Sequence, residues 1–255
     1  MTTQASVINR VSWDYSERAA TYEDRADYHD AAIARLLRQL PLPHLAQAVD
    51  IGAGTGKLTR PLLAAGLKVV AVEPNENMRA VAARMRLNDA ALWVCGRAEQ
   101  LPLPSARFDL ACFGSSFNVV DAELSLDEVT RVLKDDGVLT ILWNHRDLND
   151  PLQAAVESSI QAQIPNYTYG LRRQDPSATV LARAQFVAID SFRSSFDFTT
   201  TGDRYIAAWR SHATLARAAE SQFELAMDSI AKIVPHGKIS VPYSTAVWVF
   251  RKRRA

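Results

Sequence analysis

Three glycines at alternate positions follow a short apolar run in the segment VDIGAGTGKLT, residues 49–59. Glycine lacks a Cβ atom, so a turn built from glycines lets the backbone pass close to a ligand. An acidic side chain, Glu73, ends the next apolar run, KVVAVE. A carboxylate at that place can accept hydrogen bonds from both hydroxyl groups of a ribose. Together, the turn and the carboxylate predict a binding site for a ligand that contains a ribose.

The spacing of the glycines distinguishes three classes of ligand. A phosphate-binding loop of the form GxxxxGK[ST] needs a glycine where Ile51 stands and a hydroxyl residue where Leu58 stands. A dinucleotide-binding turn of the form GxGxxG needs a third glycine where Lys57 stands. S-adenosylmethionine (SAM) has a ribose but no diphosphate, so the spacing favours SAM, with a nicotinamide dinucleotide as the alternative. Asp50 is then predicted to orient the turn or to approach the methionyl ammonium group.

Around the turn, short apolar runs alternate with segments of helical periodicity. Alternation at this spacing predicts a parallel sheet with helices on both faces, and such sheets bind ligands beyond the carboxyl ends of their strands. Asp50 and Glu73 both stand at such ends. The predicted strands are 47–51, 68–74, 91–95, 108–116 and 138–144, and the predicted helices are 19–40, 57–66, 75–87 and 124–137, the last closed by Gly137.

The pattern changes after residue 150. The two late strands are expected to pair as an antiparallel hairpin at one edge of the sheet. We expect a single α/β domain over residues 1–255, with a helical lid at 1–45, a ligand-binding core at 46–150 and a substrate-side part at 151–255. Within that last part we predict a helix over 151–164, a polar loop over 165–177, a strand over 186–198, helices across 202–234 and a strand over 242–252.

The composition is that of an ordinary globular protein. The chain has 255 residues, 48% of them hydrophobic, and a formal net charge of +1. This balance argues against a dedicated nucleic-acid-binding protein, which usually carries a basic face. No apolar run is long enough to span a bilayer, and residues 1–25 lack the apolar core of a secretory signal. We therefore expect a cytoplasmic protein with no membrane or nucleic-acid partner.

In combination these segments resemble the class I SAM-dependent methyltransferases, in particular the small-molecule branch (methyltransferase type 11) that includes the trans-aconitate-type enzymes. WDYSERAATYEDRADY is similar to a common opening in this branch, and RVLKDDGVLTILWNHRD to its helix-turn-strand after the fourth strand. VDIGAGTGKLT resembles its first motif, VVAVEPNENM the strand with the ribose acid, and GRAEQLPLPSARFDLACFGSSFN the adenine-side loop and fourth strand.

The resemblance covers roughly residues 10–150. It implies a doubly wound, mostly parallel, seven-stranded Rossmann-like methyltransferase sheet with an antiparallel edge hairpin. It also implies N-terminal lid helices and a helical insertion before the last strand. SAM is the implied methyl donor, and no metal is expected.

The resemblance implies donor contacts from the glycine turn, the end of the second strand, the adenine-side loop and the N-terminal lid. Met78 is expected against the adenine face, and the amide of Ala98 at the edge of that ring. Many relatives have an acid where this chain has Arg97, so Glu99 is expected to replace it in recognising the adenine amino group. The full set implied for SAM is Asp50, Gly52, Ala53, Gly54, Thr55, Glu73, Pro74, Met78, Ala98, Glu99, Gly114, Tyr22 and Arg25.

Candidate acceptor contacts come from the lid and from three later segments, NHRD at 144–147, NYTYGLRR at 166–173 and YIAAWRSH at 205–212. His145 is the first candidate for a general base and His212 the second. Phe117 and Asn118 replace a His-Trp pair that relatives often carry. The residues expected to contact the acceptor are Tyr28, Asn118, Asn144, Arg146, Tyr169, Trp209 and Arg210.

The expected activity is transfer of a methyl group from SAM to a small organic metabolite. The donor is already activated, so the protein supplies position, an enclosed site and, for some acceptors, a base. Two alternatives stay open: an RNA or protein acceptor, and a SAM-binding partner protein without catalysis. We expect a monomer or a homodimer.

Overall fold

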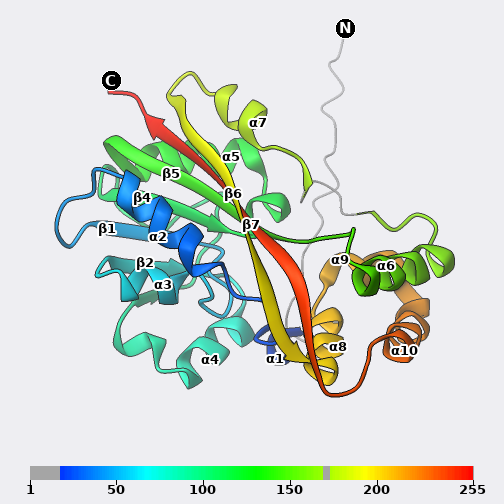
Figure 1. The fold of residues 1–255 in the computed structure, drawn as a ribbon. Helices are drawn as coiled ribbons and strands as arrows, with labels where there is room; N and C mark the ends of the chain where they lie inside the picture. Colours follow the sequence, from blue (N-terminus) through cyan, green and yellow to red (C-terminus); the bar gives the residue numbers. More distant parts are fainter. Residues whose placement is uncertain (1–17, 169–172, 255) are drawn as a thin grey trace, which may run out of the picture.

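The structure is a computed structural model that describes residues 18–168 and 173–254. Seven strands form one sheet in the order β3-β2-β1-β4-β5-β7-β6 (Figure 1). The first five in this order are parallel, and β7 runs antiparallel to both of its neighbours, which confirms the predicted fold class. The strands are β1 (Gln47–Ile51), β2 (Lys68–Val72), β3 (Leu92–Val94), β4 (Phe108–Gly114), β5 (Leu133–Arg146), β6 (Phe186–Thr201) and β7 (Lys238–Lys252).

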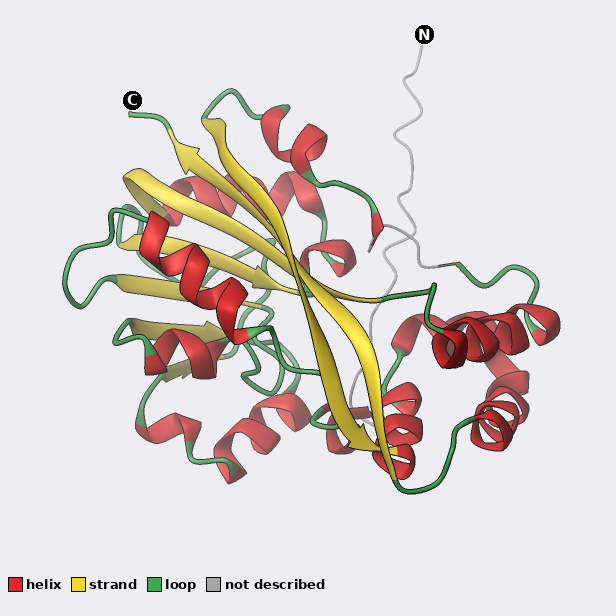
Figure 2. Cartoon of the chain, viewed as in Figure 1, coloured by secondary structure: helices red, strands yellow, loops and turns green. Residues whose placement is uncertain are grey.

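Helices cover both faces of the sheet, and a further group stands at its carboxyl side (Figure 2). The helices in the described part of the chain are α1 (Ala19–Tyr22), α2 (Asp30–Gln39), α3 (Thr59–Ala64), α4 (Glu76–Arg84), α5 (Ala122–Val132), α6 (Pro151–Gln163), α7 (Ser177–Leu181), α8 (Gly202–Arg210), α9 (Ala213–Ala219) and α10 (Phe223–Ile233). Short 3-10 turns lie at η2 (Leu87–Asp89), η3 (Phe117–Val119) and η5 (Glu220–Gln222).

Three hydrophobic clusters hold these layers together. The first packs α5 and α7 against one face of the sheet, and the second packs α2 and α3 against the other. The third lies away from the parallel strands and joins α6, α8, α9 and α10 to the tip of β7. Burial of apolar area stabilises each cluster by about 25 cal/mol per Å². The four helices of the third cluster therefore have a core of their own.

Side-chain caps fix where several helices begin. Asn75 accepts a hydrogen bond from the amide of Met78 at the start of α4, at 3.1 Å. Asp121 and Asp150 cap α5 and α6 in the same way. Each cap satisfies an amide that has no partner within its helix. These caps set the ends of the loops that lead from the strands into the helices.

The two last strands extend beyond the rest of the sheet. β5 pairs with β7 as far as Arg146 opposite Tyr243. Beyond that point, residues 238–242 of β7 pair with β6 alone in the described part of the chain. The two strands form a ribbon that reaches α8, as Figure 1 shows in yellow and red.

The prediction of one helix over residues 19–40 is wrong. Two helices, α1 and α2, stand there, and an irregular segment separates them. Its carbonyl groups are satisfied by distant side chains: Lys57 donates to Glu23 and Arg25, and Asn144 donates to Ala26 and Asp27. Because these carbonyls already have partners, the segment needs no helical hydrogen bonds.

Residues 18–45 are the described part of the region expected to form a helical lid. α2 packs its buried Ala32, Ile33 and Leu36 into the second hydrophobic cluster, so it belongs to the layer that covers the sheet. Within the described residues, α1 and the irregular segment that follows it are the part of this region that reaches the carboxyl ends of the strands.

The helix predicted over residues 124–137 ends early. α5 stops at Val132, and β5 begins at Leu133, which pairs with Phe108 of β4. The last carbonyls of α5 accept hydrogen bonds from the amides of Ala106 and Arg107. Gly137 thus lies inside β5, and the prediction that it closes a helix is wrong.

Candidate functional site

The glycine turn follows β1 and adopts backbone angles that suit glycine. Gly52 and Gly54 have φ angles of +68° and +59°. A Cβ atom on Gly52 would lie 2.6 Å from the Cβ atom of Ser116, so no larger residue fits there without movement. The amides of Gly52 and Ala53 donate to the carbonyl of Val72, which ties the turn to the end of β2.

Glu73 lies beside this turn, at the end of β2, and only 7% of it is exposed. One carboxylate oxygen accepts a hydrogen bond from the amide of Gly54 and the other from the amide of Asn75, each at 2.8 Å. Burial raises the pKa of Glu73, and the two amide bonds oppose that shift. The two amides fix the orientation of the carboxylate, and each oxygen has a second lone pair with which to accept from a ligand.

Asp50 lies beneath the turn and is fully buried. One of its oxygens accepts from the hydroxyl of Thr59 at 2.7 Å, and the other has no hydrogen-bond partner among the described residues. Burial raises the pKa of Asp50 to about 7. Of the two roles predicted for Asp50, the geometry supports orienting the turn, because the side chain lines neither cavity described below.

A cavity beside the turn, here called the glycine-turn cavity, has Glu73 in its wall. Glu99, also in the wall, accepts from the amide of Asp121 at 3.0 Å and pairs with Arg97 at 3.4 Å. Nine of the residues predicted to contact SAM line this cavity: Tyr22, Gly52, Gly54, Glu73, Pro74, Met78, Ala98, Glu99 and Gly114. Asp50 and Thr55 lie outside its lining.

A second cavity, here called the basic cavity, continues from the first. Both are lined by Tyr22, Gly52, Gly114 and Ser115. The other predicted site residues in the second lining are Arg25, Tyr28, Ala53, Asn144, His145, Arg146 and His212. The four shared residues are here called the seam between the cavities. In the described part of the chain, both candidate bases, His145 and His212, line the basic cavity.

Three residues predicted to contact the acceptor do not line either cavity. Asn118 accepts a hydrogen bond from the indole nitrogen of Trp143 at 3.3 Å. Arg210 pairs with Glu224 at 2.9 Å. Trp209 is buried, with the guanidinium of Arg146 3.6 Å from its ring centre. Tyr169 lies outside the described residues.

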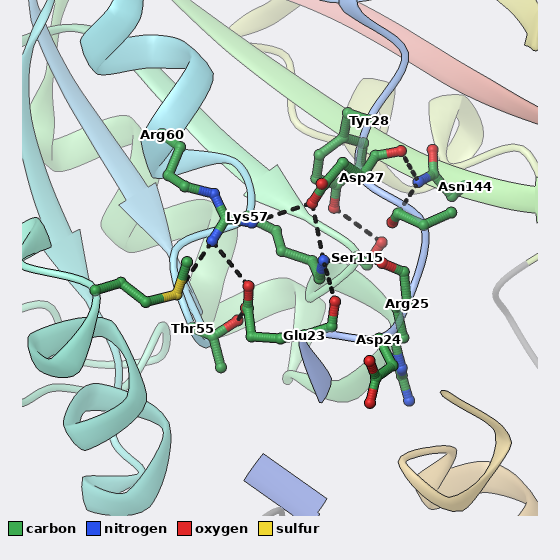
Figure 3. A network of polar contacts seen from close by, with 12 residues as sticks. Glu23, Asp24, Arg25, Asp27, Tyr28, Thr55, Lys57, Arg60, Ser115 and Asn144 are labelled. Carbon is green, nitrogen blue, oxygen red and sulfur yellow. Dashed lines mark hydrogen bonds and ion pairs between the residues drawn. The ribbon is translucent and has the colours of Figure 1, made fainter. Parts of the chain in front are cut away.

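The segment after α1 is fastened over the glycine turn by ionic contacts, which Figure 3 shows at close range. Lys57 is 8% exposed and pairs with Asp27 at 2.8 Å, in addition to its two carbonyl contacts. Arg60 pairs with Glu23 and Asp27, and the hydroxyl of Thr55 donates to Glu23. This fastening holds Tyr22 at the seam between the cavities.

The sequence reasoning missed several of these residues. From the sequence, Lys57 was noted only as the residue that departs from a dinucleotide motif. The acidic run YEDRAD could have indicated a partner for it, because this run contains Asp27, which pairs with Lys57. Ser115 bonds Tyr28 at 3.0 Å, and Tyr243 and Arg173 also line the basic cavity. Arg173 ends the segment NYTYGLRR that was expected to supply acceptor contacts, but it was not singled out. Tyr243 could not be found from local motifs, because the fold brings it in from a distant part of the chain.

The arrangement suits a ligand pair. Carboxylates that can accept hydrogen bonds from hydroxyl groups line the glycine-turn cavity, together with the glycine turn. Cationic side chains and two imidazoles line the basic cavity. A sheet of five parallel strands followed by an antiparallel edge pair, with its site at the turn after β1, is the fold of the class I methyltransferases.

Comparisons with known proteins agree with this assignment. Residues 49–141 match the family model described as "Methyltransferase domain". An uncharacterized methyltransferase of Mycobacterium tuberculosis is 37% identical over 139 residues, 54% of each chain. The ubiquinone/menaquinone biosynthesis C-methyltransferase of Rubrivivax gelatinosus is 32% identical over 134 residues, 50% of this chain and 53% of that protein. The chain thus spans about half the length of the curated relatives it matches.

A methyltransferase structure from Anaeromyxobacter dehalogenans shares the fold, with a TM-score of 0.66 and 16% identity over 90% of this chain and 97% of that one. The matched segment, residues 49–141, is similar to a methyltransferase domain, and the described chain has the fold of the class I methyltransferases. No helix among residues 18–168 and 173–254 has the length and apolarity needed to cross a membrane.

Proposed function

We propose that the protein transfers a methyl group from SAM to a small organic molecule. The observation that carries this proposal is Glu73, a buried carboxylate that two backbone amides hold beside the glycine turn. A cis-diol needs such an acceptor, and the absence of a Cβ on Gly52 leaves the backbone open to a close approach.

The wall of the glycine-turn cavity fits the donor. Glu73 would accept from the ribose hydroxyls, Met78 would lie against the adenine face, and the amide of Ala98 would meet the ring edge. Tyr22 and Arg25, at and beyond the seam, would hold the methionyl end. When bound, SAM supplies an activated methyl group, so the residues of the chain need mainly to orient the two partners and exclude water.

His145 is the proposed general base for acceptors that must lose a proton. It lies at the end of β5 in the wall of the basic cavity and is 8% exposed. An imidazole can take a proton near neutral pH. His212, from the segment between α8 and α9, lines the same cavity and is the second candidate.

A small acceptor is supported by the position of the basic cavity. The segment after α1 and the residues that follow α8 border it together, so the acceptor would lie between the sheet and the extra helices. The quinone-biosynthesis relative, which by its name methylates a carbon in a small molecule, also favours this class.

The first test is calorimetric titration with SAM and with S-adenosylhomocysteine (SAH). We expect both to bind, and we expect Glu73→Ala to weaken binding by about 100-fold or more, because two hydroxyl groups lose their acceptor. Glu76→Ala is the matched control: Glu76 is exposed, three residues further along the chain, and lines neither cavity. Unchanged SAM affinity in Glu73→Ala would contradict the assignment of the ribose site.

The second test is conversion of labelled SAM to SAH in the presence of a filtered extract of small metabolites. We expect the label to appear in a small product. Binding of SAM without any transfer, to either small or macromolecular fractions, would favour a binding protein without catalysis.

A further inference from the structure

The two cavities differ sharply in charge. Among the described residues that line the basic cavity there is no aspartate or glutamate, whereas four side chains, Arg25, Lys57, Arg146 and Arg173, are permanently or normally cationic. The glycine-turn cavity has Glu73 and Glu99 against a single arginine, Arg97. The side of the site that faces the acceptor is therefore positive.

Two of these cations are already committed to the segment that covers the site. Lys57 pairs with Asp27 and donates to two carbonyls. Arg25 donates to the hydroxyl and the carbonyl of Ser211 and lies 4.3 Å from the centre of the Tyr22 ring. No carboxylate within the described residues pairs with Arg25, which suits the methionyl carboxylate of a donor at the seam.

Arg146 lies in the wall of the basic cavity with its guanidinium against an aromatic ring. It ends β5, is 8% exposed, and its guanidinium lies 3.6 Å from the ring centre of the buried Trp209. A guanidinium stacked on an aromatic face keeps its N–H edge in one plane, which is the geometry that binds a carboxylate or phosphate with two parallel hydrogen bonds.

Arg173 adds a second cation at the same place. Its guanidinium donates to the carbonyl of Arg146 at 3.0 Å, so the two arginines lie together in the cavity wall. Asp150 and Glu157 do not line the basic cavity. Asp150 caps α6.

We propose that the acceptor carries an oxyanion group, a carboxylate or a phosphate, and that Arg146 and Arg173 bind it. This inference rests on the proposed function, since it names the class of molecule that enters the acceptor side of that site. A charged group fixed at Arg146 would leave the rest of the acceptor to reach the seam, where Gly114 and Ser115 border both cavities.

The experiment compares probes of similar shape and different charge. Benzoate, benzamide and phenyl phosphate are titrated into the full-length protein saturated with SAH, so that Arg25 is engaged by the methionyl carboxylate. We expect benzoate or phenyl phosphate to bind about tenfold more tightly than benzamide. The ratio between the two anions identifies the group that the site prefers.

Variants assign the binding to the two arginines. We expect Arg146→Gln to weaken binding of the preferred anion about tenfold, and Arg173→Gln, at an exposed residue, to weaken it by about three- to tenfold. Arg183→Gln removes a charge from the loop after α7, outside both cavities, and should leave the affinity within about twofold. SAH affinity should stay within the same range in all three variants.

Equal binding of benzoate, phenyl phosphate and benzamide, or equal losses in Arg173→Gln and Arg183→Gln, would overturn the proposal. Failure of SAH to bind at all would count against the proposed function instead. In that case the same titrations without SAH would still test whether the arginines bind an anion.

Discussion

The glycine-turn cavity and the basic cavity meet at four residues, yet the chain builds them in different ways. The first is lined almost wholly by one continuous stretch, from Gly52 to Val120, with Tyr22 added from α1. The second draws on the segment after α1, the ends of β4 and β5, Arg173, the end of α8 and Tyr243 of β7. The glycine-turn cavity is thus a local structure, and the basic cavity is assembled by tertiary contacts.

This difference predicts how mutations act on the two sides. In the glycine-turn cavity, backbone amides fix side chains, as those of Gly54 and Asn75 fix Glu73. In the basic cavity, side chains from distant elements hold the lining residues, as Ser211 holds Arg25 and Trp209 holds Arg146. The following predictions test whether a mutation in one cavity leaves the properties of the other unchanged.

The largest effect is expected at His145. If it is the base, His145→Ala should lower turnover by about two to four orders of magnitude and leave SAH affinity unchanged. Initial rates with saturating acceptor and calorimetry with SAH measure the two quantities. His212→Ala is the comparison, because both imidazoles line the basic cavity. Undiminished turnover in His145→Ala would end its role as base, and a loss confined to His212→Ala would transfer that role.

The second effect is a pH dependence of stability that comes from Asp50, buried beneath the glycine turn. The pKa of Asp50 is raised to about 7, so the folded state holds a proton that the unfolded state, with a pKa near 3.8, releases earlier. The stability that this proton contributes is present below about pH 4 and is lost as the pH rises through 7, a loss on the order of 4 kcal/mol at most.

Asp50→Asn keeps a neutral group at every pH and can still accept from Thr59. Urea unfolding of both proteins at several pH values should show wild type losing stability relative to Asp50→Asn between pH 4 and 8. Parallel pH curves for the two proteins would mean that Asp50 is ionised in the folded state.

The third effect is expected at Gly52, one of the four residues that line both cavities. Gly52→Ala should lower the free energy of unfolding by about 1–3 kcal/mol and weaken SAH binding, because a Cβ atom there would meet Ser116 at 2.6 Å. Gly66→Ala is the control: its φ of +84° gives the same backbone strain, but no atom lies within 4 Å of its Cβ position. Equal behaviour of the two variants in urea unfolding and SAH titration would show that space at the turn is not limiting.

The smallest effect is expected for the ionic contacts that hold the segment after α1 over the glycine turn. Lys57→Gln should weaken SAH binding by about three- to tenfold, because it frees two carbonyls and Asp27 next to Tyr22. Arg60→Gln, whose ion pairs are more exposed, should have less effect. A larger loss in Arg60→Gln would mean that Glu23, rather than the backbone of the segment, controls how Tyr22 is held.

The sequence was sufficient for the fold and for most of the predicted residues that line the glycine-turn cavity, and the reason is physical. The glycines at 52 and 54 need positive φ angles, Asn75 caps α4, and Glu73 ends a buried strand, so each of these features is written in a few adjacent residues. The strand alternation and the edge hairpin follow from periodicity in the same way.

Prediction was weaker where contacts between distant parts of the chain determine the local structure. The helix predicted over 19–40 breaks because Lys57 and Asn144 take its carbonyls, and no local residue signals this. Arg146 and Arg210 look alike in the sequence, yet one stacks on Trp209 in the cavity wall and the other pairs with Glu224 outside it. Only the folded structure shows which of the two arginines lines the cavity.

The ribbon made by the far ends of β6 and β7 has a consequence for how this architecture diversifies. The helices at its tip pack around a core of their own, and they join the sheet through this ribbon and the loop after β5. Substitutions within these helices can change the part of the basic cavity that Ala208 and His212 line. None of these helices contributes to the described lining of the glycine-turn cavity, so that cavity can stay unchanged.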